Sequence, residues 1–307
     1  MVTVLRPLST SELLDRTFHL YRNNFVVFAG IAALPALGVL VLQLGNAAML
    51  AAQLLIGIGV TAVFIWAASL AAMGLSHAAT VMAVSSLHLD RRVSIGSAYS
   101  ATRGKWLRVI WISLAVILIP VLIAVPIAVV LAIVLGTLGG GVVGLGVVNT
   151  IRIASGLTAL VALIVGLRWW LSWSLVIPVT VLEGGGLRAS MRRSKTLTKG
   201  TRGRIFVIAL LLIILGAIVS WIIQSPVLMI IGFRSLRNPA AVAPIMQAAS
   251  AAGVFLSTCL VGPLLTIALT LVYYDQRVRK EGFDLQLMMS TIEGGGQGAQ
   301  IAATAQP

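Results

Sequence analysis

Six long apolar runs constrain this chain more than any other feature of its sequence. Each is long enough to cross a lipid bilayer as a helix, which takes about 20 residues. Only 10% of all residues are charged, against about 25% in a typical soluble domain. With a mean hydropathy of +1.05, a soluble fold could not cover its apolar surface, so the sequence predicts an integral membrane protein. The runs cover residues 25–44, 55–87, 107–135, 153–182, 205–231 and 245–274.

The basic residues divide unevenly between the two sides of the predicted membrane. Most lie before the first run, between the second and third, between the fourth and fifth, and after the sixth. Only Arg152, Arg234 and Arg237 fall on the opposite side. Because positively charged loops remain cytoplasmic, we expect both termini to be cytoplasmic. The same placement beside apolar runs argues against nucleic acid as a partner.

The residues before the first run predict an amphipathic helix. Ser9 and Glu12 have the spacing of a capping box, in which each side chain bonds the other residue's backbone amide. Leu14, Phe18 and Tyr21 then recur on one helix face. These three side chains either anchor the helix in the membrane interface or pack it on the cytoplasmic ends of the spans, and the sequence leaves both alternatives open.

A second polar segment, EGGGLRASMRRSKTLTKGTRGR (183–204), carries the densest positive charge of the chain. Clusters of four to eight basic residues beside a membrane attract anionic lipid headgroups, at about 1 kcal/mol per charge. The alternative is that the cluster only sets topology. If the segment is one helix, the candidate headgroup-binding residues form a single stripe: Arg188, Arg192, Lys195, Lys199 and Arg202.

The chain also reads as three similar units, since RGKWLRVIWISL (103–114) resembles KGTRGRIFVIAL (199–210). We therefore predict an all-α integral membrane protein with six transmembrane helices in three hairpins. Each hairpin would be preceded by a basic amphipathic interfacial helix. Residues 1–290 would form one polytopic membrane domain, followed by a disordered tail over 291–307.

Polar groups inside the predicted spans are scarce, and none of the spans contains Asp or Glu. Two ionisable side chains remain, His77 and Arg168, and an intramembrane ionisable group is by default a candidate functional site. Three nearby tryptophans, by contrast, favour an Arg168 that extends to a headgroup region. We find no motif for phosphate binding, zinc hydrolysis or serine catalysis. The sequence thus predicts no catalytic residue, no metal site and no cofactor.

Three segments carry a family resemblance: LSTSELLDRTFHLYRNNF (8–25), VIPVTVLEGGGLRASMRRSKTLTKG (176–200) and YYDQRVRKEGFDLQLM (273–288). Together they resemble the bacterial glycerophosphoryl diester phosphodiesterase membrane domain family. Members can be fused to a catalytic phosphodiesterase domain, for which this chain has no room. The resemblance therefore implies a multi-span module of a bacterial inner membrane without the hydrolase activity.

Two functions remain open at this point. The first is a non-enzymatic membrane module that binds or organises anionic lipid. It would act as an accessory to lipid or glycerophosphodiester metabolism, through a membrane or peripheral protein partner. The alternative is a transporter for an anionic or lipid-like solute, with the buried Arg168 and His77 facing its path.

Overall fold

The computed structural model describes residues 8–88, 91–116, 156, 160, 164–235 and 239–282. These residues form helices and short connections, with no β-strand among them. The predicted all-helical membrane class is confirmed at this level. The third predicted span, 107–135, is described only as far as Val116, and the predicted tail lies outside the described residues. Within these described ranges, five segments are long and apolar enough to cross a membrane: Phe25–Ala51, Gly57–His88, Ile164–Glu183, Arg202–Met229 and Val242–Glu281.

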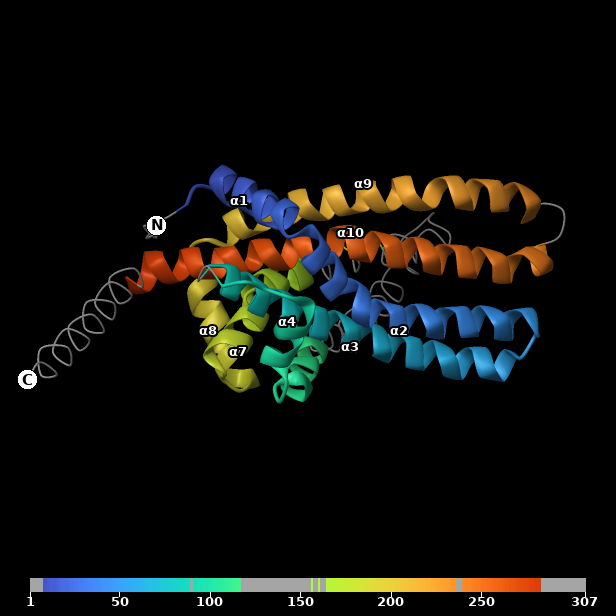
Figure 1. Cartoon of the computed structure of the whole chain (residues 1–307), viewed down its shortest axis with the longest axis horizontal. Coiled ribbons are helices and arrows are strands. Elements are labelled where there is room, and N and C mark those ends of the chain that lie inside the picture. The colour runs from blue at the N-terminus through green and yellow to red at the C-terminus, as the bar shows by residue number, and fades with distance from the viewer. Residues whose placement is uncertain are drawn as a thin grey trace, which may run out of the picture.

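Two antiparallel helix pairs extend toward the same end of the molecule (Figure 1). One pair is α2 (Phe25–Ala51) with α3 (Leu55–His88). The other is α9 (Arg202–Ser235) with α10 (Pro239–Glu281). Helix α10 packs against α9 on one side and against α2 and α3 on the other, so it is the central helix of the described fold.

Four shorter helices gather at the opposite end, which we call the basic end (Figure 1). They lie beside the ends of the long helices, and α1 and α8 both contact α10. Since the predicted cytoplasmic loops meet here, the basic end corresponds to the predicted cytoplasmic side. The four helices are α1 (Thr10–Asn23), α4 (Ile95–Thr102), α7 (Val176–Glu183) and α8 (Leu187–Thr198).

The starts of two of these helices follow from serine caps. The capping box of α1 is confirmed: Ser9 Oγ accepts the amide of Glu12 at 3.2 Å, and Glu12 Oε2 accepts the amide of Ser9 at 2.7 Å. A similar box of Ser94 and Ser97 begins α4. Helix α4 contains no charged residue. The basic residues Arg91 and Arg92 lie before it, and Arg103 follows it. The prediction of a basic helix before the second hairpin is therefore wrong for α4.

Glycine and proline set the ends of the helices around the basic segment. Gly200 has φ +85°, a left-handed conformation that other residues rarely adopt, and α8 ends at Thr198. The predicted continuous stripe is therefore wrong beyond this point, since Arg202 begins α9. Earlier, the helix over 164–173 is interrupted before α7. Pro178 has no amide to donate to the carbonyl of Ser174, which explains the break.

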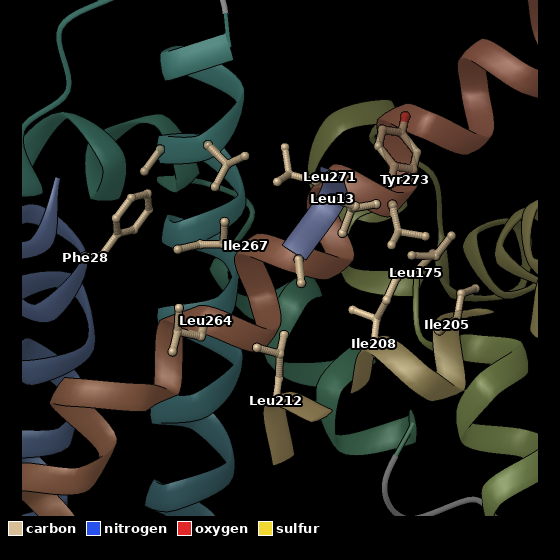
Figure 2. Close-up of a cluster of buried hydrophobic side chains, with 14 of the residues drawn as sticks. Leu13, Phe28, Leu175, Ile205, Ile208, Leu212, Leu264, Ile267, Leu271 and Tyr273 are labelled. Atoms are coloured by element: carbon tan, nitrogen blue, oxygen red, sulfur yellow. The ribbon is translucent and has the colours of Figure 1, made fainter. Parts of the chain in front are cut away.

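The largest apolar cluster lies near the basic end, where α1 and the ends of α2, α7, α9 and α10 meet (Figure 2). Farther along the helix pairs, large apolar side chains are exposed, among them Val63 at 67% and Trp221 at 71%. A water-soluble protein rarely exposes so much apolar surface, so lipid is the fitting solvent for this part. The fully or almost fully buried side chains in Figure 2 are Leu13, Phe28, Leu175, Ile205, Ile208, Leu212, Leu264, Ile267, Leu271 and Tyr273.

Two tyrosines of the short helices bond carbonyls beside prolines in the long helices. Pro35 in α2 cannot donate to the carbonyl of Ile31, and the Tyr99 hydroxyl of α4 donates to it at 2.6 Å. Burial raises the pKa of the Tyr99 hydroxyl, which keeps this donor protonated. Tyr21 of α1 donates to the carbonyl of Leu260, which is next to the carbonyl of Cys259 that Pro263 leaves without its helical donor. A membrane helix tolerates proline where neighbouring groups satisfy the freed carbonyls.

We expect Tyr99→Phe to lower the free energy of unfolding by about 1 to 2 kcal/mol, because it leaves the Ile31 carbonyl without a donor. The measurement is a denaturation titration in mixed detergent micelles. The matched test repeats the substitution in a Pro35→Ala background, where the new amide can bond Ile31 itself. There, Tyr99→Phe should cost less than half as much, and an equal cost in both backgrounds would contradict this role.

Candidate functional site

The outer face of α8 and the residue after it carry four exposed cations. Its inner face is neutral and buried, formed by Ser190, Ser194, Leu197 and Thr198. The Ser194 hydroxyl donates to the carbonyl of Ser172 at 2.9 Å, which fixes this face against the helix over 164–173. The basic side chains are thereby held on the outer side. These four residues, Arg188, Arg192, Lys195 and Lys199, are exposed, and we call them the basic surface.

Arg193 also lies on α8, but it forms ion pairs within the protein. Its Nε lies 3.1 Å from Glu183 Oε2, and its Nη1 lies 2.5 Å from Glu281 Oε1. The hydrogen bond to Glu281 is the main cause that raises the pKa of the Arg193 guanidinium, with further contributions from Glu183. Tyr273 also donates to Glu183, at 2.9 Å. Arg193 therefore ties α8 to α7 and α10, and its charge is compensated.

The carboxyl end of α8 is closed by a lysine from α10. Lys280 Nζ donates to the carbonyls of Thr196, Leu197 and Lys199 at 2.9, 2.8 and 2.7 Å. A cation is favourable here because the last carbonyls of a helix lack intrahelical donors and carry partial negative charge. This contact orients α8 without using any of the four cations of the basic surface as a donor.

A buried carboxylate joins the chain start to α9 and α10. The Asp275 side chain is fully buried, with Arg204 Nη1 2.6 Å and Arg279 Nε 2.9 Å from its Oδ2. Its Oδ1 accepts the amide of Leu8 at 2.8 Å, and Arg204 Nη2 donates to the Leu8 carbonyl at 2.8 Å. Sequence reasoning missed this cluster. The only local signal is the i,i+4 spacing of Asp275 and Arg279.

These contacts divide the basic residues into two groups. Among the described residues, the acidic groups Glu183, Asp275 and Glu281 pair with arginines that face the interior of the basic end. The basic surface has no ion-pair partner among the residues that the structure describes. Its positive charge is therefore uncompensated and outward. Arg202, the fifth predicted member, is only partly exposed and lies on α9.

The predicted anchoring residues of α1 divide between the protein and the surface. Leu14 and Tyr21 pack against the main apolar cluster, whereas Phe18 is 41% exposed. The fully buried positions of α1 are Leu13 and Thr17, one residue before Leu14 and Phe18. Helix α1 thus packs on the ends of the spans, and Phe18 is the predicted anchor that remains available to lipid.

The two predicted intramembrane residues lie apart. His77 on α3 lines a cavity of about 320 Å³ between α2, α3 and α10. Arg168 is exposed on the helix over 164–173 and is not among the residues that line this cavity. The structure therefore does not bring these two side chains to one site.

We find no cluster of three or more His, Cys, Asp or Glu residues with metal-ligand geometry in the part of the chain that the structure describes. No protein-family model, curated protein or solved structure matches this chain. The functional proposals below therefore rest on the geometry of the basic end and of the cavity beside His77.

We expect Asp275→Asn to lower the free energy of unfolding by about 3 kcal/mol, because two arginines and the Leu8 amide lose one buried carboxylate. This is the low end for a buried pair, since the Arg279 side chain is 36% exposed. Detergent denaturation measures the loss, and trypsin release of an N-terminal tag measures loosening of the chain start. The control is Asp15→Asn, at an exposed acid of α1, which should change neither readout.

Proposed function

We propose that this chain is a non-enzymatic, multi-pass membrane module that binds or organises anionic lipid at its basic end. The observation that carries the proposal is the basic surface: Arg188, Arg192, Lys195 and Lys199 are exposed and uncompensated on and just after one anchored helix. Because α8 is fixed through its neutral face, its cations already point outward and the helix need not become ordered when a lipid binds. Such preorganised cations suit phosphate-bearing headgroups, which accept several hydrogen bonds each.

Topology alone accounts less well for this arrangement. A charge that only retains a loop in the cytoplasm needs no fixed direction, and Arg193 and Arg204 show that cations of this segment can be paired inward. The four remaining cations are left outside by a helix that is fixed through Arg193, Ser194 and Lys280. A fixed outward surface supports binding.

The finer topology is part of the same proposal. It includes the third predicted span, 107–135, which would complete six spans in three hairpins with both termini cytoplasmic. The bacterial inner membrane and the kinship with the glycerophosphoryl diester phosphodiesterase membrane domain family rest on the three sequence segments alone. A protein partner in lipid or glycerophosphodiester metabolism rests on that resemblance too.

Transport by way of a buried arginine has weaker support. Arg168 is exposed, and the cavity that His77 lines includes no charged side chain. An anionic solute would find no cation in this cavity. The transport alternative therefore needs a path other than this cavity.

The test is a triple substitution, Arg188→Gln, Arg192→Gln and Lys195→Gln. Binding of phosphatidylglycerol to the purified protein, followed by native mass spectrometry, should weaken at least several-fold, since each charge contributes about 1 kcal/mol before screening. The dependence of binding on salt should also fall, because fewer ions pair with the headgroup. Phosphatidylcholine binding should not change.

The matched control removes the same net charge elsewhere at the basic end, through Arg91→Gln, Arg92→Gln and Arg103→Gln. All three are exposed. Equal losses in the two triple variants would indicate a general attraction and contradict a dedicated surface. Unchanged lipid binding with an inverted orientation, measured by labelling of engineered cysteines, would show that the charges only set topology.

A further inference from the structure

Helices α2, α3 and α10 line a continuous hollow within the span region. The cavity beside His77 has a volume of about 320 Å³, and a second hollow of about 400 Å³ shares four lining residues with it. The first volume is within the range of about 300 to 1,000 Å³ that is usual for small-molecule sites. The shared residues, which make the two hollows contiguous, are Gln43, Ser69, Ala251 and Val254.

The lining of the first cavity is mostly small and apolar, with a few neutral polar groups from all three helices. Pro35 lines it from α2, at the position where the regular hydrogen bonding of that helix is interrupted. No Asp, Glu, Lys or Arg is among the lining residues of either hollow. The polar residues of the first cavity are Gln43, Ser69, Ser76, His77 and Thr258.

Hydroxyl groups in membrane helices normally bond a carbonyl of their own helix. Ser69 does so, donating to Ile65 at 2.7 Å, and Thr270 donates to Thr266 at 2.7 Å. Ser76 and Thr258 also line the cavity, but their hydroxyl groups have no hydrogen-bond partner among the described residues.

The same holds for two larger polar groups of the cavity. In the part of the chain that the structure describes, the His77 ring and the Gln43 amide have no hydrogen-bond partner. A polar group without a partner in an apolar medium costs about 2 kcal/mol or more. Thr258 is exposed, whereas Ser76 and His77 are half-buried and adjacent on α3 beside the hollow. These two groups therefore indicate a site that is completed by a bound molecule.

The second hollow contains a polar cluster whose members bond one another. Asn46 donates to the hydroxyl of Thr61 and to the carbonyl of Ile58, at 3.2 Å for the latter. Gln247 of α10 donates in turn to the Asn46 side chain. This cluster joins α2, α3 and α10 within the protein, so its polar atoms need no ligand. The contrast separates a structural cluster from a binding one.

We propose that the cavity beside His77 binds an uncharged amphiphile, a molecule with an apolar body and a hydroxyl-type polar group. The apolar lining would hold the body, while the imidazole of His77 and the hydroxyl of the neighbouring Ser76 would bond the polar end. A charged ligand is disfavoured because no lining residue can pair with it, and an unpaired buried charge is far more costly than a neutral group. The basic surface and this cavity thus take ligands of different chemistry.

The experiment uses a monoacylglycerol with a photoreactive diazirine in its acyl chain, added to the full chain in phosphatidylcholine nanodiscs. Lysophosphatidic acid with the same chain is the comparison, since it differs by one phosphate. Mass spectrometry of proteolytic fragments should locate monoacylglycerol adducts on residues 69–77 of α3. Lysophosphatidic acid should label them at least about fivefold less, the ratio that corresponds to roughly 1 kcal/mol.

Four substitutions make the test specific. Ala72→Trp fills the cavity and His77→Phe removes the ring nitrogens, and both should reduce labelling at least about fivefold. His77→Gln retains a hydrogen-bonding group and should keep more than half of it. Val63→Trp, on the same helix but at a position that lines neither hollow, should change nothing.

Three results would overturn the proposal: equal labelling in the filled and control variants, equal labelling by the phosphate-bearing probe, or no monoacylglycerol adduct in the cavity. Thermal stability identifies a variant that fails to fold, and His77→Phe and His77→Gln then decide the outcome without Ala72→Trp. The triple glutamine variant of the basic surface should leave this labelling unchanged. The two proposals can therefore fail separately.

Discussion

The buried carboxylate of Asp275 is the interaction on which the arrangement of the basic end depends. It pairs with one arginine of α9 and one of α10, and it accepts the backbone amide of Leu8. Arg204 and Asp275 are 71 residues apart, so this pair closes the α9–α10 helix pair at its base. The chain start is bound to the same group, which places α1 across α10. Without the carboxylate, Arg204 and Arg279 would lie close together with no compensating charge between them.

Inward pairing also explains why the remaining charge points outward. The acidic groups at the base of α10 are used by Arg193, Arg204 and Arg279, and Lys280 is used by the end of α8. The cations that remain unpaired are those of the basic surface, which lie on the side of α8 opposite its buried, neutral face. Packing thus separates the paired arginines of this segment from the four cations of the basic surface. Each group can therefore be tested by its own substitutions.

The bilayer imposes a second constraint, because it offers no water to backbone or side-chain polar groups. The fold meets it in two ways. Where Pro35 frees a carbonyl, the Tyr99 hydroxyl supplies the missing donor. Where Asn46 is buried between helices, Gln247 and Thr61 complete its bonds. The buried hydroxyls of Thr80 and Ser113 also lack a partner in the part of the chain that the structure describes. What indicates a ligand beside Ser76 and His77 is therefore the hollow that they line.

The sequence by itself determined the membrane class, the helical spans that could be described, the serine cap of α1 and the presence of a basic, amphipathic α8. These properties are local: they depend on hydrophobic run length, on a three-residue cap and on the 3.6-residue period. The early end of α8 is local as well, but Gly200 decides it through a backbone conformation that a charge stripe does not reveal. Only the tertiary structure decided which cations are paired and which are free. Only it placed His77 on a hollow lined by three helices and kept Arg168 out of that lining. Such neighbours come from distant parts of the chain and are set by packing and by the cost of leaving polar groups unsatisfied, which no local pattern encodes.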